Sequence, residues 1–339
     1  MTTDHYPQVR SNALTGDRVL VAPARAGRPQ AEPREPERRQ LPAFDPTCPF
    51  CPGNESQTPG ELYRWPGGAG AGGWGVRVVP NKYPALARQA AGPPAAAPDP
   101  QSVESAVGRH EVIIEARAHD RRYTNLTDNE VLEVMKACRA RFAAAATDER
   151  VEHVIIFRNQ GAMANASIEH PHSQLAGLGF VPPTLTSKLE RCQRHLDATG
   201  RALLIDILEG ELADGARIVE ATDNLVTFVP YAPTYDFEIW VAPRRVPPRF
   251  DGLDDATLAQ LGVAVRRAAS AMELALQHPD YNGILQTPPL SAGAETALPW
   301  YFQIIPRRYL AAGFELGVGV HILLTTPEEA AERLRSAQN

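Results

Sequence analysis

The segment His170-Pro171-His172-Ser173-Gln174 constrains the fold of this chain more than any other, because its polar side chains alternate along it. A β-strand places residues i, i+2 and i+4 on the same face. Pro171 favours this extended state, since a proline disfavours the α conformation for the residue before it. We therefore expect a strand here, with His170, His172 and Gln174 pointing the same way.

The same residues suggest two kinds of chemistry. An imidazole ring can act as a nucleophile towards phosphorus, and a nearby side-chain amide can stabilise charge on a phosphoryl oxygen. A loop of small residues at 159–165 precedes the segment and would let a ligand approach the backbone closely. The alternative is a metal-binding or simply polar strand edge, and the segment alone leaves both open.

Two cysteines form a second cluster, Cys48-Pro-Phe-Cys51. Two close thiols need two further ligands for a tetrahedral zinc ion, and histidine is the usual supplement. A redox dithiol would need a strand before the motif and a helix after it, but Pro46 precedes it and Pro52-Gly53 follow it. We therefore predict a structural zinc site. The histidines that could complete it are His110, His119, His153 and His170.

Helix signals and hydrophobic runs alternate along the chain. Thr127 and Glu130 form a capping box that predicts a helix to about Ala146, and Thr326 with Glu329 forms another. Further helices are predicted over 186–198 and 255–277. Strands are predicted over 111–116, 153–157, 175–181, 225–229, 237–241, 282–286, 300–305 and 319–324. The pattern predicts an α+β fold with antiparallel sheet and flanking helices.

Ordered segments along nearly the whole chain carry a resemblance to a known family. They are 12–17, 19–21, 25–29, 48–55, 76–85, 108–115, 157–183, 312–319 and 327–330. In these segments the chain resembles the galactose-1-phosphate uridylyltransferase family of the histidine-triad superfamily. The resemblance implies two fused histidine-triad-like repeats. The N-terminal half, 1–183, would carry the zinc site and the nucleophile, and the C-terminal half, 184–339, would form a substrate wall.

The resemblance also implies a covalent reaction in two steps. His172 would attack the α-phosphorus of UDP-glucose and form a uridylyl-imidazole intermediate, and galactose 1-phosphate would then take the UMP group. Gln174 would steady the phosphoryl oxygens. The implied zinc ligands are Cys48, Cys51, His119 and His170, with His110 as the main rival for the third place. The implied substrate-binding residues are Arg25 and Arg28 near the phosphates, Asn81 near the nucleoside, Asn159 and Ser167 around the transferred phosphate, and Glu315 and His321 at the sugar.

Two of these assignments have a plain structural alternative. Arg25 and Arg28 could build the positive field that a diphosphate needs, or they could be solvated loop arginines. His321 could contact the sugar, or it could be a structural histidine buried in a strand.

The second half departs from the family's pattern. Laid on the first half, Tyr301 falls at the position of His172 and Gln303 at that of Gln174. The family normally has two histidines here, which can bind a second metal ion with another histidine and a glutamate. The position of that glutamate holds Lys188, whose ammonium group has no lone pair for a metal. We therefore expect one zinc ion and no second metal site.

The altered second half leaves other functions open. A relative that uses phosphate as acceptor would be a nucleotide-sugar or dinucleoside-polyphosphate phosphorylase, and one that uses an unusual sugar 1-phosphate would be another transferase. Outside enzymes, the alternative is a zinc-stabilised nucleotide-binding protein, but the intact His172 and Gln174 argue against it. The expected partners are a nucleotide sugar and a sugar 1-phosphate, with a homodimer as an expectation from the family alone.

Composition limits the remaining classes. The chain has 339 residues, of which 43% are hydrophobic, enough for one large core or two fused halves. Its net charge of −6 argues against a nucleic-acid partner. No stretch reaches membrane-spanning length, and the first residues hold no apolar leader, so we expect no membrane association. Four cysteines with a C-x-x-C motif favour a reducing cytoplasm.

Overall fold

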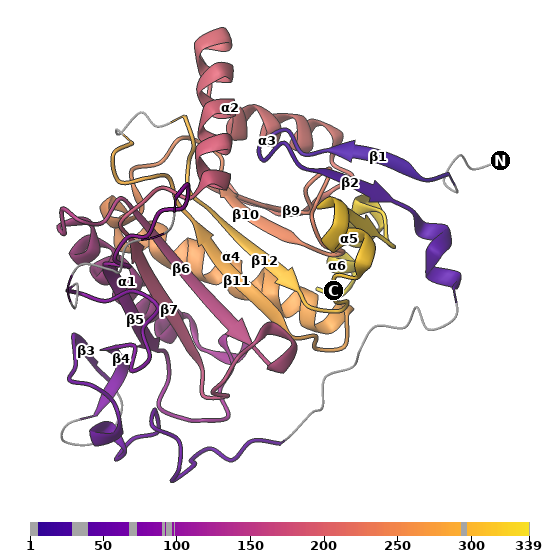
Figure 1. Cartoon of the computed structure of the whole chain (residues 1–339). Helices are drawn as coiled ribbons and strands as arrows, with labels where there is room; N and C mark the ends of the chain where they lie inside the picture. Colours follow the sequence, from indigo (N-terminus) through magenta and orange to yellow (C-terminus); the bar gives the residue numbers. More distant parts are fainter. Residues whose placement is uncertain are drawn as a thin grey trace.

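The computed structural model describes residues 6–28, 40–67, 73–89, 92, 97, 99–292 and 297–338. Within these residues, ten strands form one antiparallel sheet with helices on both faces (Figure 1). In order across the sheet, the strands are β3 (Tyr63–Pro66), β4 (Trp74–Pro80), β5 (Gly108–Ile114), β7 (His172–Leu178), β6 (His153–Gln160), β11 (Tyr281–Gln286), β12 (Tyr301–Pro306), β10 (Ile239–Pro243), β9 (Leu225–Phe228) and β8 (Ile218–Ala221). The predicted α+β fold with antiparallel sheet is confirmed.

The order of the strands shows two repeats. Outwards from the central pair β6 and β11, the first half continues with β7, β5, β4 and β3, and the second half continues with β12, β10, β9 and β8. Each strand of the first half thus has a counterpart in the second, in the same chain order. Helix α1 (Asp128–Ala146) follows β5, and helix α4 (Asp255–Ala275) follows β10 in the same way. The two fused repeats are therefore present, whereas the boundary after residue 183 stays a prediction.

The pairing of the strands determines which residues correspond. Phe157 on β6 pairs with Ile284 on β11, where the two repeats meet. Outwards from this pair, Phe157 pairs with Gln174, and Ile284 pairs with Gln303. Gln303 therefore stands where Gln174 stands, as the sequence comparison predicted. The residues two positions before these glutamines correspond too, so Tyr301 stands at the position of His172.

Helices cover the two faces of the sheet differently. Helices α1, α4 and α6 (Pro327–Ser336) pack on one face and close the main hydrophobic core. Helices α2 (Pro183–Thr199) and α3 (Leu203–Asp214) pack on the other face, over β9 and β10 of the second half (Figure 1). The buried residues of this contact include Leu185, Leu204, Leu208, Phe228 and Trp240. The same face of the first half carries Gln174, so a site there lies beside α2 rather than under it.

Most predicted helices begin where their sequence signals lie. Thr127 caps α1 and Thr326 caps α6, each by accepting a hydrogen bond from a backbone N–H three residues on. α2 begins at Pro183, earlier than predicted, because proline suits the first turn of a helix. α3 was not predicted, since Ala202 before it has no side-chain oxygen for a cap. The predicted strands are all present, with ends shifted by a few residues.

A smaller sheet joins the two ends of the chain. Within the described residues it consists of β1 (Gln8–Ser11), β2 (Arg18–Val21) and β13 (His321–Leu323), with β2 in the centre. β13 runs parallel to β2, and His321 pairs with Val19. Figure 1 draws β1 and β2 on the opposite side of the molecule from β5 and β7. None of the helices described is long and apolar enough to cross a membrane.

Candidate active site

His172 begins β7, and its ring is held in one orientation. Nδ1 lies 2.8 Å from the backbone carbonyl oxygen of His170, which can only accept a hydrogen bond, so Nδ1 carries the proton. The lone pair of the neutral ring is then on Nε2. The side chain is 7% exposed and contacts the ring of Phe50, and burial lowers the pKa of His172. The ring therefore offers an unprotonated nitrogen, as nucleophilic attack requires.

A buried ion pair holds the opposite face of β7. Ser173 donates a hydrogen bond from Oγ to Glu115 Oε1 at 2.5 Å, and Arg158 on β6 pairs with the same carboxylate. All three side chains are buried. Breaking such a pair leaves a buried charge without a partner, which is strongly destabilising. β7 is thus anchored at the residue between His172 and Gln174.

Four buried side chains meet next to β7: Cys48, Cys51, His119 and His170. Their ligand atoms all lie within 4.8 Å of one another. Sγ of Cys51 is 3.6 Å from Nδ1 of His119 and 3.6 Å from Nδ1 of His170. Nε2 of His170 lies 2.8 Å from the carbonyl oxygen of Ala116, so it carries the ring proton and leaves the Nδ1 lone pair facing the cluster. This group could hold a metal ion.

The strand expected over His170 to Gln174 includes His172 and Gln174 but not His170. β7 begins at His172, and His170 lies before the strand, with its ring in the cysteine cluster. The reason lies in Pro171, which has no N–H to donate to the neighbouring strand. Sheet pairing therefore starts after the proline, at the pair of His172 with Ile114.

Gln174 lies two residues along β7 from His172, on the same face. Its side-chain oxygen, Oε1, is 2.9 Å from Nε2 of His110 and 3.2 Å from Nδ2 of Asn81. The structure thus brings Asn81, predicted near the nucleoside, next to Gln174. It also places His110 beside Gln174 on β5 rather than in the cysteine cluster.

Asn159 and Ser167 belong to β6 and to the loop between β6 and β7. The β6–β7 register, continued by one residue, sets Asn159 opposite His172. Asp280 in the second half accepts a hydrogen bond from this loop's backbone at 2.7 Å. Gly161 is required here, since its φ is +85° and a Cβ would lie 1.9 Å from Asp280 Oδ1. The loop is therefore packed tightly against the second repeat.

The other predicted substrate residues form a separate group around the small sheet. Arg25 and Arg28 lie in and just after the short helical turn that follows β2. Glu315, in helix α5 (Gly313–Val318), accepts a hydrogen bond from the backbone N–H of the residue that precedes the helix, at 2.9 Å. Glu315 and His321 line one cavity of about 50 Å³. These four residues do not lie next to His172 of the same chain. The small sheet and β7 are on opposite sides of the molecule (Figure 1).

Comparison with known proteins places this geometry in a family. The model of the galactose-1-phosphate uridyl transferase N-terminal domain matches residues 1–182. ADP-glucose phosphorylase of Arabidopsis thaliana is 31% identical over 97% of this chain and 92% of its own length. The chain belongs to the galactose-1-phosphate uridylyltransferase family. It is an enzyme, a nucleotidyltransferase, and the resemblance inferred from its sequence is confirmed.

Further relatives agree with this membership. Galactose-1-phosphate uridylyltransferase of Haemophilus influenzae is 29% identical over 98% of this chain and 95% of its own length. The crystal structure of the Arabidopsis ADP-glucose phosphorylase with bound ADP-glucose superposes with a TM-score of 0.82, at 30% identity, covering 97% of this chain and 98% of that one. A solved uridylyltransferase structure gives a TM-score of 0.76 at 27% identity, covering 98% of each chain.

In this family member, the second repeat holds a different set of polar contacts at the corresponding place. Lys188 on α2 donates a hydrogen bond to the hydroxyl of Tyr301 at 2.8 Å, and both side chains are buried. Gln303 donates to Glu238 at 2.7 Å. The lysine and tyrosine that stand at two ligand positions of the family's second metal site are therefore in direct contact, and they join α2 to the sheet.

The Lys188–Tyr301 contact predicts an asymmetry in stability. Tyr301→Phe should lower the free energy of unfolding by about 1–3 kcal/mol, because it leaves a buried ammonium group without its acceptor. The double variant Lys188→Met, Tyr301→Phe should be closer to wild type, since both polar groups are then gone. Urea denaturation of the two variants checks this. Equal stability of Tyr301→Phe and wild type would contradict it.

Sequence reasoning missed three residues of this site. His110 was considered only as a metal ligand, although it lies in the matched segment 108–115. Asn282 and Asp280 belong to the second repeat, and they contact the first-half loop from more than a hundred positions away. The one available signal was the period of two in β5, which puts His110 on the face of Val112, the residue that pairs with Gln174.

Proposed function

We propose that this protein moves a nucleoside monophosphate from a nucleotide sugar to a sugar 1-phosphate through a covalent nucleotidyl-His172. The pair of substrates that we assign first is UDP-glucose and galactose 1-phosphate, by analogy with the named relatives. The observation that carries the proposal is the fixed tautomer of His172, whose Nε2 lone pair stands beside Gln174 on one face of β7.

The reaction has two balanced steps. Nε2 of His172 attacks the α-phosphorus of the nucleotide sugar, a P–N bond forms, and the P–O bond to the β-phosphate breaks, so that the sugar 1-phosphate leaves. A phosphate oxygen of the acceptor then attacks the same phosphorus, and the P–N bond breaks. Gln174, Asn159 and Ser167 donate hydrogen bonds to the phosphoryl oxygens, where charge develops in both steps. Arg25 and Arg28, which lie away from His172 of the same chain, would add positive charge for the diphosphate from a second copy of the chain.

We propose zinc as the metal held by Cys48, Cys51, His119 and His170. A thiolate and an imidazole nitrogen on one tetrahedral zinc are about 3.6 Å apart, given the usual bond lengths. The two contacts of Cys51 Sγ, both 3.6 Å, support this assignment. Four protein ligands leave no open position, so the ion would stabilise the residues before β7 and take no part in the chemistry.

A second acceptor is inorganic phosphate, which would make the protein a nucleotide-sugar phosphorylase. The similarity to the Arabidopsis ADP-glucose phosphorylase, 31% over 97% of this chain, favours this candidate specifically. In that reaction the first step is unchanged, and phosphate oxygen attacks the nucleotidyl-His172 to release a nucleoside diphosphate. The two candidates differ only in the second step.

A trapping experiment separates the candidates. UDP-glucose and ADP-glucose, each labelled in the α-phosphate, are incubated with the protein without an acceptor, and excess donor is removed. Galactose 1-phosphate, glucose 1-phosphate or inorganic phosphate is then added. Release of label by a sugar 1-phosphate, but not by phosphate, supports the transferase. Efficient release of the label by inorganic phosphate alone would contradict the transferase assignment and support the phosphorylase.

Glu315 is proposed to read the sugar, because a carboxylate can accept hydrogen bonds from two hydroxyls. Glu315→Gln should lower kcat/KM for a sugar 1-phosphate by roughly 10- to 150-fold, the equivalent of about 1.5–3 kcal/mol for hydrogen bonds to a charged group. The amide oxygen can still accept the bond that begins α5. Labelling of His172 by a nucleotide donor whose leaving group carries no sugar provides the control and should stay unchanged. An equal loss in both half-reactions would contradict a sugar contact.

A homodimer and a cytoplasmic location complete the proposal. Phe314, Leu316 and Val318 on α5 are exposed, and exposed apolar side chains that gather on one segment often mark an interface. Contact between two copies would also let Arg28 and Glu315 of one chain approach His172 of the other. The four cysteines are buried and free, which supports a reducing compartment.

A further inference from the structure

We propose that His110 and Asn282 are positioning residues that fix the side-chain amides of Gln174 and Asn159, respectively. Each holds its amide by the oxygen, so that the NH2 group, and not the oxygen, faces the phosphoryl group on His172. The inference rests on the proposed function and names the residues that orient its phosphate site.

The orientation of Gln174 follows from two backbone N–H groups. The N–H of Ala85 donates to Nδ1 of His110 at 3.0 Å, so Nδ1 is the acceptor and the neutral ring carries its proton on Nε2. That Nε2–H then donates to Gln174 Oε1 at 2.9 Å. The N–H of Tyr83 donates to Asn81 Oδ1 at 2.9 Å, which turns the NH2 group of Asn81 towards the same oxygen at 3.2 Å. Two donors therefore hold Oε1, and the NH2 group of Gln174 is left for a ligand.

The orientation of Asn159 follows from a backbone carbonyl. Asn282 donates from Nδ2 to the carbonyl oxygen of Ala164 at 3.1 Å. A carbonyl can only accept, so the NH2 group of Asn282 must point there. The same NH2 group donates to Asn159 Oδ1 at 2.9 Å. The oxygen of Asn159 is therefore occupied, and its NH2 group is free to face His172, which lies opposite it in the strand register.

The second repeat provides an internal comparison. In the second repeat Gln303 pairs with Trp240, and Glu238 lies two residues before Trp240. In the first repeat Gln174 pairs with Val112, and His110 lies two residues before Val112. Glu238 is an acceptor, and Gln303 donates to it from Nε2 at 2.7 Å. The amide of Gln303 is thus reversed relative to that of Gln174. The donor or acceptor character of this one neighbour decides which end of the amide is presented.

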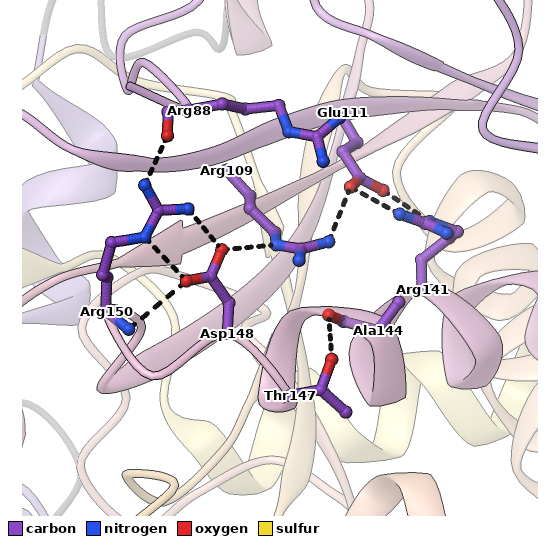
Figure 2. Close-up of polar contacts among 8 residues, drawn as sticks. All are labelled: Arg88, Arg109, Glu111, Arg141, Ala144, Thr147, Asp148 and Arg150. Carbon is purple, nitrogen blue, oxygen red and sulfur yellow. Dashed lines mark hydrogen bonds and ion pairs between the residues drawn. The ribbon is translucent and has the colours of Figure 1, made fainter. Parts of the chain in front are cut away.

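Ion pairs restrain the face of β5 opposite to His110. Arg109 pairs with Asp148 at 3.2 Å, and Arg141 makes two hydrogen bonds with Glu111, at 2.7 and 2.8 Å. Figure 2 shows these contacts side by side, with Arg150 reaching the backbone of the loop that follows Asn81. β5 is therefore fixed on both sides of His110, and the loop that supplies the Ala85 N–H is fixed with it.

The consequence is electrostatic. Phosphoryl oxygens are negative, so an N–H donor stabilises them and an amide oxygen repels them. A side-chain amide without these partners could present either its oxygen or its NH2 group to the phosphoryl oxygens, and it would have to rotate during the reaction. Here the donors are set before the substrate arrives, and no reorganisation is needed during the reaction.

The test is a double-mutant cycle on formation of the nucleotidyl-enzyme from UDP-glucose or ADP-glucose. Gln174→Ala should lower the rate by roughly 10²–10³, as for loss of one oxyanion donor. His110→Leu should lower kcat by at least tenfold with little change in KM, and should cause no further loss in the Gln174→Ala background. His110→Gln, which keeps a donor at the position of Nε2, should recover most of the rate. Asn282→Ala should behave in the same way with Asn159→Ala.

The outcomes distinguish this inference from the proposed function. Wild-type protein that gains no nucleotidyl group contradicts the proposed function, and this inference with it. Wild-type labelling combined with additive losses in both cycles contradicts the inference alone. Thermal melting of each variant accompanies the kinetics, because a general loss of fold would lower the rate equally in both backgrounds and would also count against positioning.

Discussion

We expect His172→Asn to show no nucleotidyl transfer while it keeps the fold of the wild type. Asparagine can still donate to the carbonyl oxygen of His170, as Nδ1 does now at 2.8 Å, so the residues before β7 stay in place. Its amide nitrogen has no free lone pair to attack phosphorus. The loss in rate should be on the order of 10⁶, the scale seen when the nucleophile of a covalent enzyme is removed. Steady-state rates with each nucleotide sugar, together with circular dichroism, check this.

A matched control is His278→Asn. His278 lies outside the site with φ near +59°, a conformation that asparagine tolerates well. Its activity should equal that of the wild type.

Double-reciprocal plots of wild-type rates should be parallel, since a covalent intermediate separates the two substrates. Intersecting lines, or a His172→Asn variant with near wild-type rate, would exclude the covalent mechanism.

We expect Cys51→Ser to lose the metal and much of its stability. Cys51 is fully buried, and its Sγ contacts both histidines of the cluster. Metal binding is linked to folding, so loss of a ligand should cost several kcal/mol and lower Tm by on the order of 10 °C. Elemental analysis of freshly purified protein should find about one zinc per wild-type chain and far less in the variant.

The control for this variant is Cys138→Ala, which removes a buried thiol from α1, away from the cluster. It should keep the metal and lose only the packing of one sulfur atom. The assignment fails if wild-type protein is fully folded without metal. It fails equally if Cys51→Ser retains as much metal as Cys138→Ala.

Local signals in the sequence were enough to predict much of the fold. Thr127 and Thr326 each placed a helix start at the correct residue, because a capping side chain acts within one turn. The match of Gln303 to Gln174 also held, since two repeats that share a fold keep the same strand register. Helix starts and the correspondence between the two repeats were therefore readable from the sequence.

Contacts between distant segments were not readable in the same way. Asn282 orients a residue 123 positions earlier, and only the pairing of β6 with β11 brings the two together. His170 lies outside the strand because Pro171 interrupts the pairing, and its ring joins the cysteine cluster, a contact that periodicity does not encode. Glu315 and Arg28 were assigned to one site with His172, yet they lie around the other sheet. Spacing gives the face of a residue, whereas tertiary packing decides its neighbours.

The most direct test of the central claim is the mass of the protein after incubation with a nucleotide sugar and no acceptor. The account predicts that a fraction of the wild-type chain gains one nucleoside monophosphate, that peptide mapping places it on His172, and that a suitable acceptor removes it. His172→Asn should gain nothing under the same conditions. A wild-type chain that turns over substrate without any such adduct, or an adduct on a different residue, would contradict the account.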